Sequence, residues 1–209
     1  MEMKRQLVIA TGNRHKGREM VEILGVALSG TGIEILTLAD FPGVDADVEE
    51  TGSTFVENAA IKARAAAEAT GRVCIADDGG LVIDALGGEP GIHSKRFLGA
   101  DTPFPEKMAR ILELMGGVEE EKRTCRFVCA VAICTPDGRL VECSGVCEGR
   151  IAHEMRGAFG FGYDPIVLIP EAGKQMAELR PAEKHRISHR GKALACATVE
   201  IGRLFGVGS

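Results

Sequence analysis

Residues 6–24 read QLVIATGNRHKGREMVEIL, and this stretch decides the fold class. The apolar run 6–10 predicts a short buried strand, and the small and polar residues 11–16 predict a turn. The helix predicted after the turn has one apolar face, formed by Met20, Val21, Ile23 and Leu24. A strand that passes through a tight turn into a helix is the building unit of an α/β fold.

The rest of the chain repeats this alternation and then adds a hairpin. Helices are predicted over 54–70, 103–115 and 191–205, and the first of them opens on a capping box at Thr54 and Glu57. Further strands are predicted over 33–38, 73–76 and 166–169. Two long strand-like runs, 123–135 and 139–151, flank the turn signal Pro136-Asp137-Gly138 and predict an antiparallel hairpin. We therefore expect an α/β fold with a mixed sheet and flanking helices, in a single domain covering residues 1–209.

Composition narrows the class of protein. The chain has 209 residues, of which 45% are hydrophobic, so it can bury a sizeable core. A net charge of -5 argues against bulk attraction to nucleic acid, because nucleic-acid binders usually carry a basic surplus. The apolar run near the N-terminus is too short for a signal peptide, and no run approaches a membrane span. We expect a cytoplasmic protein that binds neither nucleic acid nor membrane.

Seven cysteines are present, an odd number. In a cytoplasmic protein this count argues against a disulfide framework. The pairs Cys125/Cys129 and Cys143/Cys147 lie in strand-like runs and lack the spacing of zinc knuckles. The cysteines are therefore interpreted as small buried hydrophobic residues, with a metal or redox role as the alternative.

The segment Thr11–Lys16 is the first candidate site. Free amides at a helix start attract phosphate, Gly12 lets the backbone approach closely, and Lys16 adds a cation. The alternative is an ordinary turn in which Asn13 caps the helix. No Walker phosphate-binding motif occurs anywhere in the chain.

The segment Asp77-Asp78-Gly79-Gly80 is the second candidate site. Its two carboxylates are expected at the end of strand 73–76, an edge where ligands bind in α/β sheets. Alternation along the strand predicts that one Asp faces the ligand and the other braces the loop. Carboxylate oxygens suit Mg²⁺, and the alternative is a polar turn capped by Asp.

Two further segments have features of a base-binding site. In Phe159–Pro165, which reads FGFGYDP, glycines flank aromatic rings on which a purine can stack, although the aromatics can equally plug the core. In Lys184–Lys192, which reads KHRISHRGK, basic residues open the last predicted helix and can donate to carbonyl oxygens or phosphate. The alternative there is a solvated basic helix start. Together the four segments form the set that a nucleotide hydrolase requires.

Five ordered motifs carry a family resemblance. They are TGNRHK, FVENAAIKA, ADDGGLVIDALGGEPGIHSKRF, FGFGYDP and ISHRGKAL, spread from residue 10 to residue 194. In this set the chain resembles the inosine triphosphate pyrophosphatase family, also called dITP/XTP diphosphatases. The resemblance implies Mg²⁺-dependent hydrolysis of ITP, dITP and XTP to the monophosphate and pyrophosphate. It also implies a homodimer and an ITPase-like two-lobed fold, with the substrate cleft between the lobes.

The resemblance also implies roles for individual residues. Asp78 would be the catalytic acceptor, and Glu50, from the acidic stretch 40–52, would share the metal with it. The substrate would be held by Thr11, Gly12, Asn13, Arg14, His15, Lys16, Gly79, Phe161, Gly162, Tyr163, Asp164, Lys184, His189 and Arg190. Among these, Lys184, His189 and Arg190 would donate to the 6-carbonyl of the base.

Gly79 departs from the family pattern, which usually has Ser there. A lost hydroxyl bond to phosphate would cost about 0.5–1.5 kcal/mol. A smaller departure is the segment His93-Ser94-Lys95-Arg96, where the family often has an aromatic residue first and a small residue third. Two rival functions stay open at this point. One is an aspartyl-phosphate phosphatase with Asp78 as the nucleophile, although it usually needs an Asp-x-Asp spacing. The other is a nucleotide- or RNA-binding module that uses the basic segment.

Overall fold

The computed structural model describes residues 5–45 and 48–207, so positions 46–47 of the acidic stretch lie outside the described residues. The helices are α1 (Arg14–Ala27), α2 (Phe55–Thr70), α3 (Phe104–Leu114), α4 (Pro181–Ile187) and α5 (His189–Phe205). The strands are β1 (Gln6–Ile9), β2 (Glu34–Thr37), β3 (Val73–Ile83), β4 (Thr124–Cys134), β5 (Leu140–Ile151), β6 (Val167–Ile169) and β7 (Lys174–Gln175). Among the described helices, none is long and apolar enough to cross a membrane.

The strands form one sheet in the order β2-β1-β3-β4-β5-β6-β7. β1 runs parallel to β2 and β3, whereas β6 runs antiparallel to both β5 and β7. β4 and β5 are neighbours joined at the predicted turn, where the amide of Thr135 donates to the carbonyl of Arg139. The predicted α/β class, the mixed sheet and the hairpin are therefore confirmed.

The chain divides into two compact units. Unit 1 contains Met1–Asp78, Cys129–Gly145 and Arg190–Ser209, and unit 2 contains Gly79–Val128 and Val146–His189. The strands β3, β4 and β5 each contribute residues to both units. Each unit has a hydrophobic core of its own.

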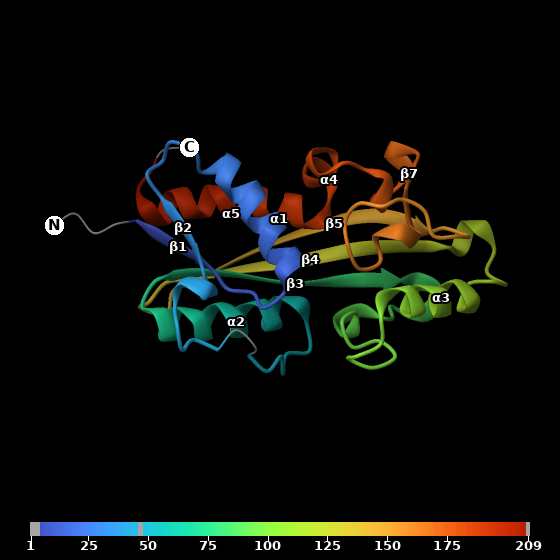
Figure 1. Cartoon of the computed structure of the whole chain (residues 1–209), viewed down its shortest axis with the longest axis horizontal. Coiled ribbons are helices and arrows are strands. Elements are labelled where there is room, and N and C mark those ends of the chain that lie inside the picture. The colour runs from blue at the N-terminus through green and yellow to red at the C-terminus, as the bar shows by residue number, and fades with distance from the viewer. Residues whose placement is uncertain (1–4, 46–47, 208–209) are drawn as a thin grey trace. The chain divides into compact units, whose positions relative to one another are not determined.

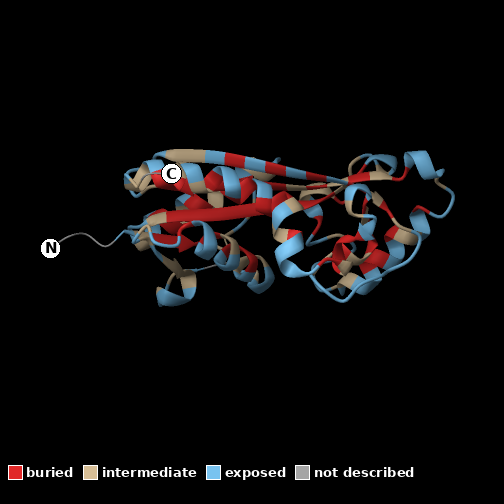
Figure 2. Ribbon diagram, turned by 90° about the horizontal axis from the view of Figure 1, so that it is seen from above, coloured by how far each residue is buried: buried red, intermediate tan, exposed pale blue. Residues whose placement is uncertain are grey.

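In unit 1, helices cover both faces of the sheet (Figure 1). On one face α1 and α5 bury apolar side chains such as Leu24 and Leu194 against Ile75 and Val131. On the other face the buried residues that α2 contributes to a cluster with Val8 are alanines, including Ala63, and Phe55 and Val56 pack against that cluster from the start of the helix. Figure 2 shows the result as red helix faces turned to the strands and pale blue faces turned outward. Because alanine is small, the backbone of α2 lies close to the sheet, and its polar side chains can reach the strands from there.

In unit 2, α3 supplies apolar side chains to a second core. Met108 and Ile111 pack with Leu81 of β3 and with Val167 of β6. The buried Arg123 donates to the carbonyls of Met115, Ile151 and Ala152, at distances of 2.6 to 2.8 Å. One side chain thus bonds the carbonyl that follows α3 and those at the end of β5.

The prediction that a strand ends at Asp77 is wrong, because β3 runs on to Ile83. The glycine pair does not break the strand; it admits a close neighbour. A Cβ on Gly80 would lie 2.3 Å from Ser94 Oγ and 2.5 Å from the carbonyl oxygen of Gly91. Ser94 Oγ accepts a hydrogen bond from the Leu81 amide at 3.0 Å, so the hydroxyl packs where a side chain would otherwise stand.

Two other expectations need correction. Val21, expected on the apolar face of the first helix, is 40% exposed, because the buried stripe of α1 contains Glu19, Met20 and Leu24 instead. The basic segment does not simply open the last helix. Lys184 lies in the separate helix α4, and α5 begins at His189, two residues earlier than predicted.

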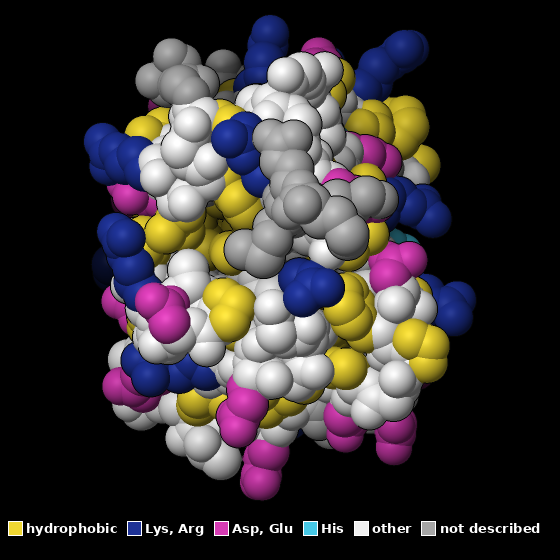
Figure 3. All heavy atoms as spheres, turned by 90° about the vertical axis from the view of Figure 1, so that its left-hand side faces the viewer, with side chains coloured by type: hydrophobic (Ala, Val, Ile, Leu, Met, Phe, Trp, Pro, Cys, Tyr) yellow, Lys and Arg dark blue, Asp and Glu magenta, His cyan; other side chains and the backbone are white. Residues whose placement is uncertain are grey.

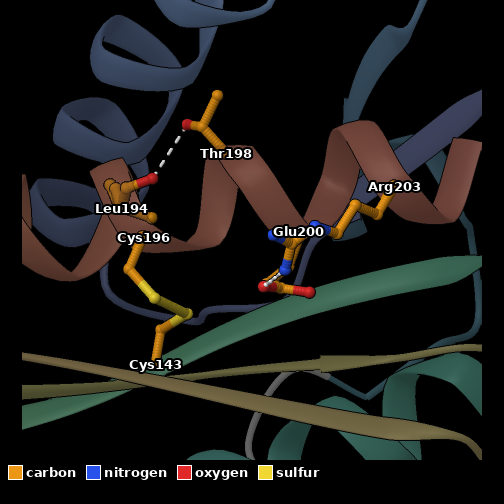
Figure 4. The surroundings of a disulfide bond; sticks show 6 residues. All are labelled: Cys143, Leu194, Cys196, Thr198, Glu200 and Arg203. Carbon is orange, nitrogen blue, oxygen red and sulfur yellow. Dashed lines mark hydrogen bonds and ion pairs between the residues drawn. A yellow bond between two sulfur atoms is a disulfide. The ribbon is translucent and has the colours of Figure 1, made fainter. Parts of the chain in front are cut away.

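The expectation that the cysteines are unpaired is wrong for one pair. Cys143 of β5 and Cys196 of α5 form a disulfide with their Cα atoms 6.0 Å apart, as Figure 4 shows. Both residues belong to unit 1. The odd count still leaves five free cysteines, at positions 74, 125, 129, 134 and 147, and all five are buried as expected. The pairing was invisible in the sequence because a separation of 53 residues does not reveal that α5 lies on β5.

Candidate active site

The phosphate loop Thr11–Lys16 follows β1 and runs into α1. Asn13 is the N-cap, and its Oδ1 accepts hydrogen bonds from the amides of His15 at 3.0 Å and Lys16 at 3.2 Å. Those two amides are therefore already bonded to the cap. The amides of Gly12 and Arg14 have no acceptor among the described residues, so they are the donors left for an anion.

A pocket of about 520 Å³ opens beside this loop. Its walls include Gly12, Asn13 and Arg14 of the loop, Arg18 of α1 and Leu38 after β2. This volume lies within the usual range of small-molecule sites. In the described part of the chain, Arg14 and Arg18 make no ion pair, and they leave positive charge on the pocket wall.

The two aspartates lie just beyond the end of β1. The last register pair joins Ile9 of β1 to Ile75 of β3, so Asp77 and Asp78 extend past the point where the phosphate loop turns away. The predicted placement at the carboxyl edge of parallel strands therefore holds for β1, although β3 itself continues. Both side chains are buried, Asp77 completely and Asp78 to all but 6%.

Asp78 faces α2 and the phosphate loop. Its Oδ1 lies 3.5 Å from Lys62 Nζ and 3.8 Å from Lys16 Nζ, and its Oδ2 lies 3.4 Å from Asn58 Nδ2. Lys62 also donates to Glu50 Oε1 at 2.7 Å. The predicted pair Glu50 and Asp78 is thus brought together around one ammonium group.

Asp77 faces α5 and α1. Its Oδ2 accepts from Arg190 Nε at 3.0 Å and from Arg190 Nη2 at 2.8 Å, and Lys16 Nζ lies 3.6 Å away. Arg190 Nη1 donates to Glu19 Oε2 at 2.6 Å. Seven charges therefore alternate in sign through unit 1 in the order Glu19, Arg190, Asp77, Lys16, Asp78, Lys62, Glu50, and we call this series the charge chain.

The electrostatics of the two aspartates differ. Burial alone would raise the pKa of Asp77, but Lys16 and Arg190 outweigh it and hold the pKa well below its usual range. Burial raises the pKa of Asp78, and Lys62 and Lys16 only partly offset this effect. For Lys62, burial would lower the pKa, yet the carboxylates of Asp78 and Asp77 raise it. Asp77 is therefore held in its ionised form, whereas the lysines do not fully offset the burial that disfavours ionised Asp78.

Lys62, Asn58 and Glu19 were not predicted as site residues. Asn58 and Lys62 are four residues apart, on the side of the Ala-rich helix α2 that faces the sheet. Two polar residues at that spacing among buried alanines are the signal that identifies them. Glu19 is the only acidic residue in the buried stripe of α1, and it lies one turn after Lys16.

The aromatic loop belongs to unit 2. Tyr163 is buried, donates its hydroxyl to the carbonyl of Ser94 at 2.9 Å and meets Phe104 edge to face, so this ring fills the core. Phe161 is only half-buried and has Lys184 Nζ 4.8 Å from its ring centroid. The core-filling alternative therefore applies to Tyr163, and stacking of a base on Phe161 stays a prediction.

Asp164 organises this loop. Its Oδ2 accepts from the Phe161 amide at 2.8 Å and from Lys184 Nζ at 2.6 Å, and both carboxylate and ammonium are buried. A Cβ on Gly160 would lie 2.0 Å from the same oxygen, so only glycine fits there. The structure thus brings together Phe161, Asp164 and Lys184.

His189 and Arg190, the other two predicted donors to the base, make contacts of a different kind. His189 stacks on Phe127 with ring centroids 4.9 Å apart, inside unit 2. Arg190 belongs to unit 1, where its guanidinium is engaged by Asp77 and Glu19. The contacts of His189 and Arg190 with a base stay predictions, as do those of Gly79 and Gly162.

Comparison with known proteins identifies the family of this chain. The model of the Ham1 family matches residues 7–198. The chain belongs to the Ham1 family. It is 48% identical over 190 residues to a dITP/XTP pyrophosphatase of Geobacillus kaustophilus, with 91% of each chain covered. It is 44% identical over 200 residues to a dITP/XTP pyrophosphatase of Desulforamulus reducens, covering 96% of this chain and 97% of that protein.

Solved Ham1 structures share the fold. A HAM1 protein from Coxiella burnetii has a TM-score of 0.84 and 41% sequence identity, with 95% of this chain and 98% of that chain covered. As a Ham1 protein, this chain therefore has both the predicted family and the predicted ITPase-like α/β fold.

Proposed function

We propose that the chain hydrolyses the deaminated purine nucleoside triphosphates ITP, dITP and XTP to the monophosphate and pyrophosphate. The dITP/XTP pyrophosphatases at 42–48% identity support this reaction. The observation in the molecule that carries it is Asp78, a buried carboxylate between two lysines beside a phosphate loop. Removing such nucleotides would clear deaminated purines from the nucleotide pool.

The charge chain fits a magnesium ion. Its four carboxylates and three cations leave one net negative charge, and burial raises the pKa of Asp78, so a further cation there would stabilise the ionised carboxylate. Within the described residues there is no group of three or more metal-binding side chains, so protein ligands alone do not complete a site. Mg²⁺ commonly takes one or two carboxylates and completes its shell with water and substrate phosphates. Asp78 and Glu50 would hold it, and it would neutralise phosphate oxygens and orient water.

The protein's own residues then accept the proton and stabilise the negative charge of the leaving group. Asp78 accepts a proton from the attacking water, for which its raised pKa makes it a stronger base than an exposed aspartate. Water adds to the α-phosphorus, the bond to the bridging oxygen breaks, and pyrophosphate leaves with that electron pair. Lys16 and Lys62 balance the charge of the departing group, and the amides of Gly12 and Arg14 hold its oxygens.

Base selection is proposed for unit 2. The face of Phe161 offers a stacking surface, and Asp164 holds Lys184 in one place. An ammonium group donates to the 6-carbonyl of hypoxanthine or xanthine, whereas the 6-amino group of adenine leaves that donor unpaired. Buried donors without a partner are costly, and discrimination follows from that cost.

The homodimer and the substrate cleft remain proposals carried by the family resemblance, and the cytoplasmic location remains a proposal carried by the sequence. The dimer is tested by sedimentation or light scattering of the full chain. On the face shown in Figure 3, basic and acidic side chains are interspersed. We propose no nucleic-acid or membrane partner.

The test is a substrate panel of ITP, dITP, XTP, GTP and ATP with Mg²⁺, in which pyrophosphate and orthophosphate are measured separately. We expect preference for the deaminated purines, pyrophosphate as first product, and no turnover by Asp78→Asn. In ¹⁸O-labelled water the label should enter the monophosphate, because water attacks the α-phosphorus. Preference for ATP, orthophosphate as first product, or label in pyrophosphate would overturn the proposal.

A further inference from the structure

Glu19 lies at the far end of the charge chain from Glu50. It is 8% exposed, and its carboxylate meets the side of the Arg190 guanidinium that Asp77 does not occupy. The three residues come from three distant parts of the chain, since Arg190 is 171 residues from Glu19 and 113 from Asp77.

The guanidinium links the two carboxylates rigidly. Arginine is planar, and its donors form a fixed fork, so bonding one edge to Glu19 sets the plane in which the other edge meets Asp77. Asp77 Oδ2 receives both Nε and Nη2 of Arg190, at 3.0 and 2.8 Å. Asp77 Oδ1 is buried and has no hydrogen-bond partner among the described residues, so Arg190 and Lys16 provide the orientation of this carboxylate.

Asp77 in turn sets the position of its neighbours. Asp77 Oδ2 draws Lys16 Nζ to 3.6 Å, and the same ammonium lies 3.8 Å from Asp78 Oδ1. Asp77 and Asp78 are also consecutive residues of one strand, so a backbone shift that accompanies a new position of Asp77 would move Asp78 as well. A displacement of about 1 Å at a reacting group can cost on the order of a hundredfold in rate.

We propose that Glu19 is a positioning residue for the hydrolysis, acting through Arg190 and Asp77 on Lys16 and Asp78. This inference rests on the proposed function. It predicts an effect on the chemical step, because the contact of Glu19 with Arg190 leads through Asp77 to Lys16 and Asp78.

The first experiment compares Glu19→Gln with Glu22→Gln. Glu22 is one turn further along α1 and exposed, which makes it a matched control for loss of a carboxylate from this helix. With saturating Mg²⁺ and ITP, Glu19→Gln should lower kcat about tenfold and change KM less than twofold, and Glu22→Gln should match the wild type. Wild-type kcat per folded Glu19→Gln molecule, with only a lower Tm, would overturn the proposal.

The second experiment tests whether Glu19 acts through Arg190. Arg190→Lys retains the charge but loses the fork, and the double variant Glu19→Gln/Arg190→Lys should be no slower than Arg190→Lys alone. Multiplying losses would place the action of Glu19 elsewhere and overturn the proposal. If Glu19→Gln does not fold, Glu19→Asp keeps the charge and takes its place.

A readout independent of turnover completes the test. The NMR signal of the Arg190 Nε–H should be protected from solvent exchange in the wild type and lose that protection in Glu19→Gln. Unchanged protection would overturn the positioning role. If the wild-type enzyme released no pyrophosphate, that result would overturn the proposed function. The exchange of this proton would still decide separately whether Glu19 positions Arg190.

Discussion

The disulfide Cys143–Cys196 should contribute strongly to the stability of unit 1. It closes a loop of 53 residues that leaves unit 1 within β5, after Gly145, passes through unit 2 and returns to unit 1 in α5. In the chain-entropy treatment, a loop of this length gives about 4 kcal/mol of stabilisation at 25 °C. For a chain of this size, about 4 kcal/mol corresponds to a Tm change of roughly 8–16 °C.

The perturbation is reduction with dithiothreitol or the substitution Cys196→Ser. Cys196 is exposed on α5, so a reductant reaches the bond without unfolding the protein. Thermal unfolding is followed by circular dichroism with and without reductant, and free thiols are counted in each sample. We expect the wild-type Tm to fall on reduction, and Cys196→Ser to have the lower Tm under both conditions.

Cys134→Ser is the matched control, because Cys134 is a free buried cysteine of the same unit. It should retain the full dependence of Tm on reductant. A wild-type Tm that does not change while two further thiols appear would refute the loop-closure argument. Seven free thiols before reduction would refute the bond itself.

Three further predictions follow from the site. Gly79→Ser should keep or modestly raise kcat/KM, because Gly79 lies in β3 and is not among the described glycines with positive φ; a large loss of kcat/KM would contradict this. Gly80→Ala should instead lower Tm, because the added Cβ would collide with Ser94. Asp78→Asn should abolish turnover yet match or exceed the wild-type Tm at pH 7. Because the pKa of Asp78 is raised in the folded protein, its ionised form at pH 7 lowers the free energy of unfolding, and a Tm below that of the wild type would contradict this direction. Metal removal with EDTA should abolish activity reversibly, and activity that survives EDTA would exclude the metal. With Mg²⁺ present, kcat/KM should fall in acid as Asp78 becomes protonated, and the fall should begin at a pH above the ordinary aspartate pKa of 3.8.

Much of the fold was predictable because its signals are local. The strand–turn–helix of residues 6–24 and the Pro136-Asp137-Gly138 turn depend on periodicity and turn chemistry within a few residues. The end of β3 was mispredicted for a related reason. A glycine pair ordinarily marks a loop, and only the hydroxyl of Ser94, 14 residues after Gly80, explains why a strand continues through it.

The candidate site was predictable in its types of residue and less so in its contacts. By itself the sequence determined the α/β class and the family resemblance, and it predicted the phosphate loop and the role of Asp78, because those depend on residues that are neighbours in the chain. Only the tertiary structure decided that Arg190 meets Asp77 and Glu19, that Lys62 joins Glu50 to Asp78, and that Cys143 meets Cys196. Charges and thiols select partners by proximity and burial, and helices packed on a sheet create that proximity between residues far apart in sequence.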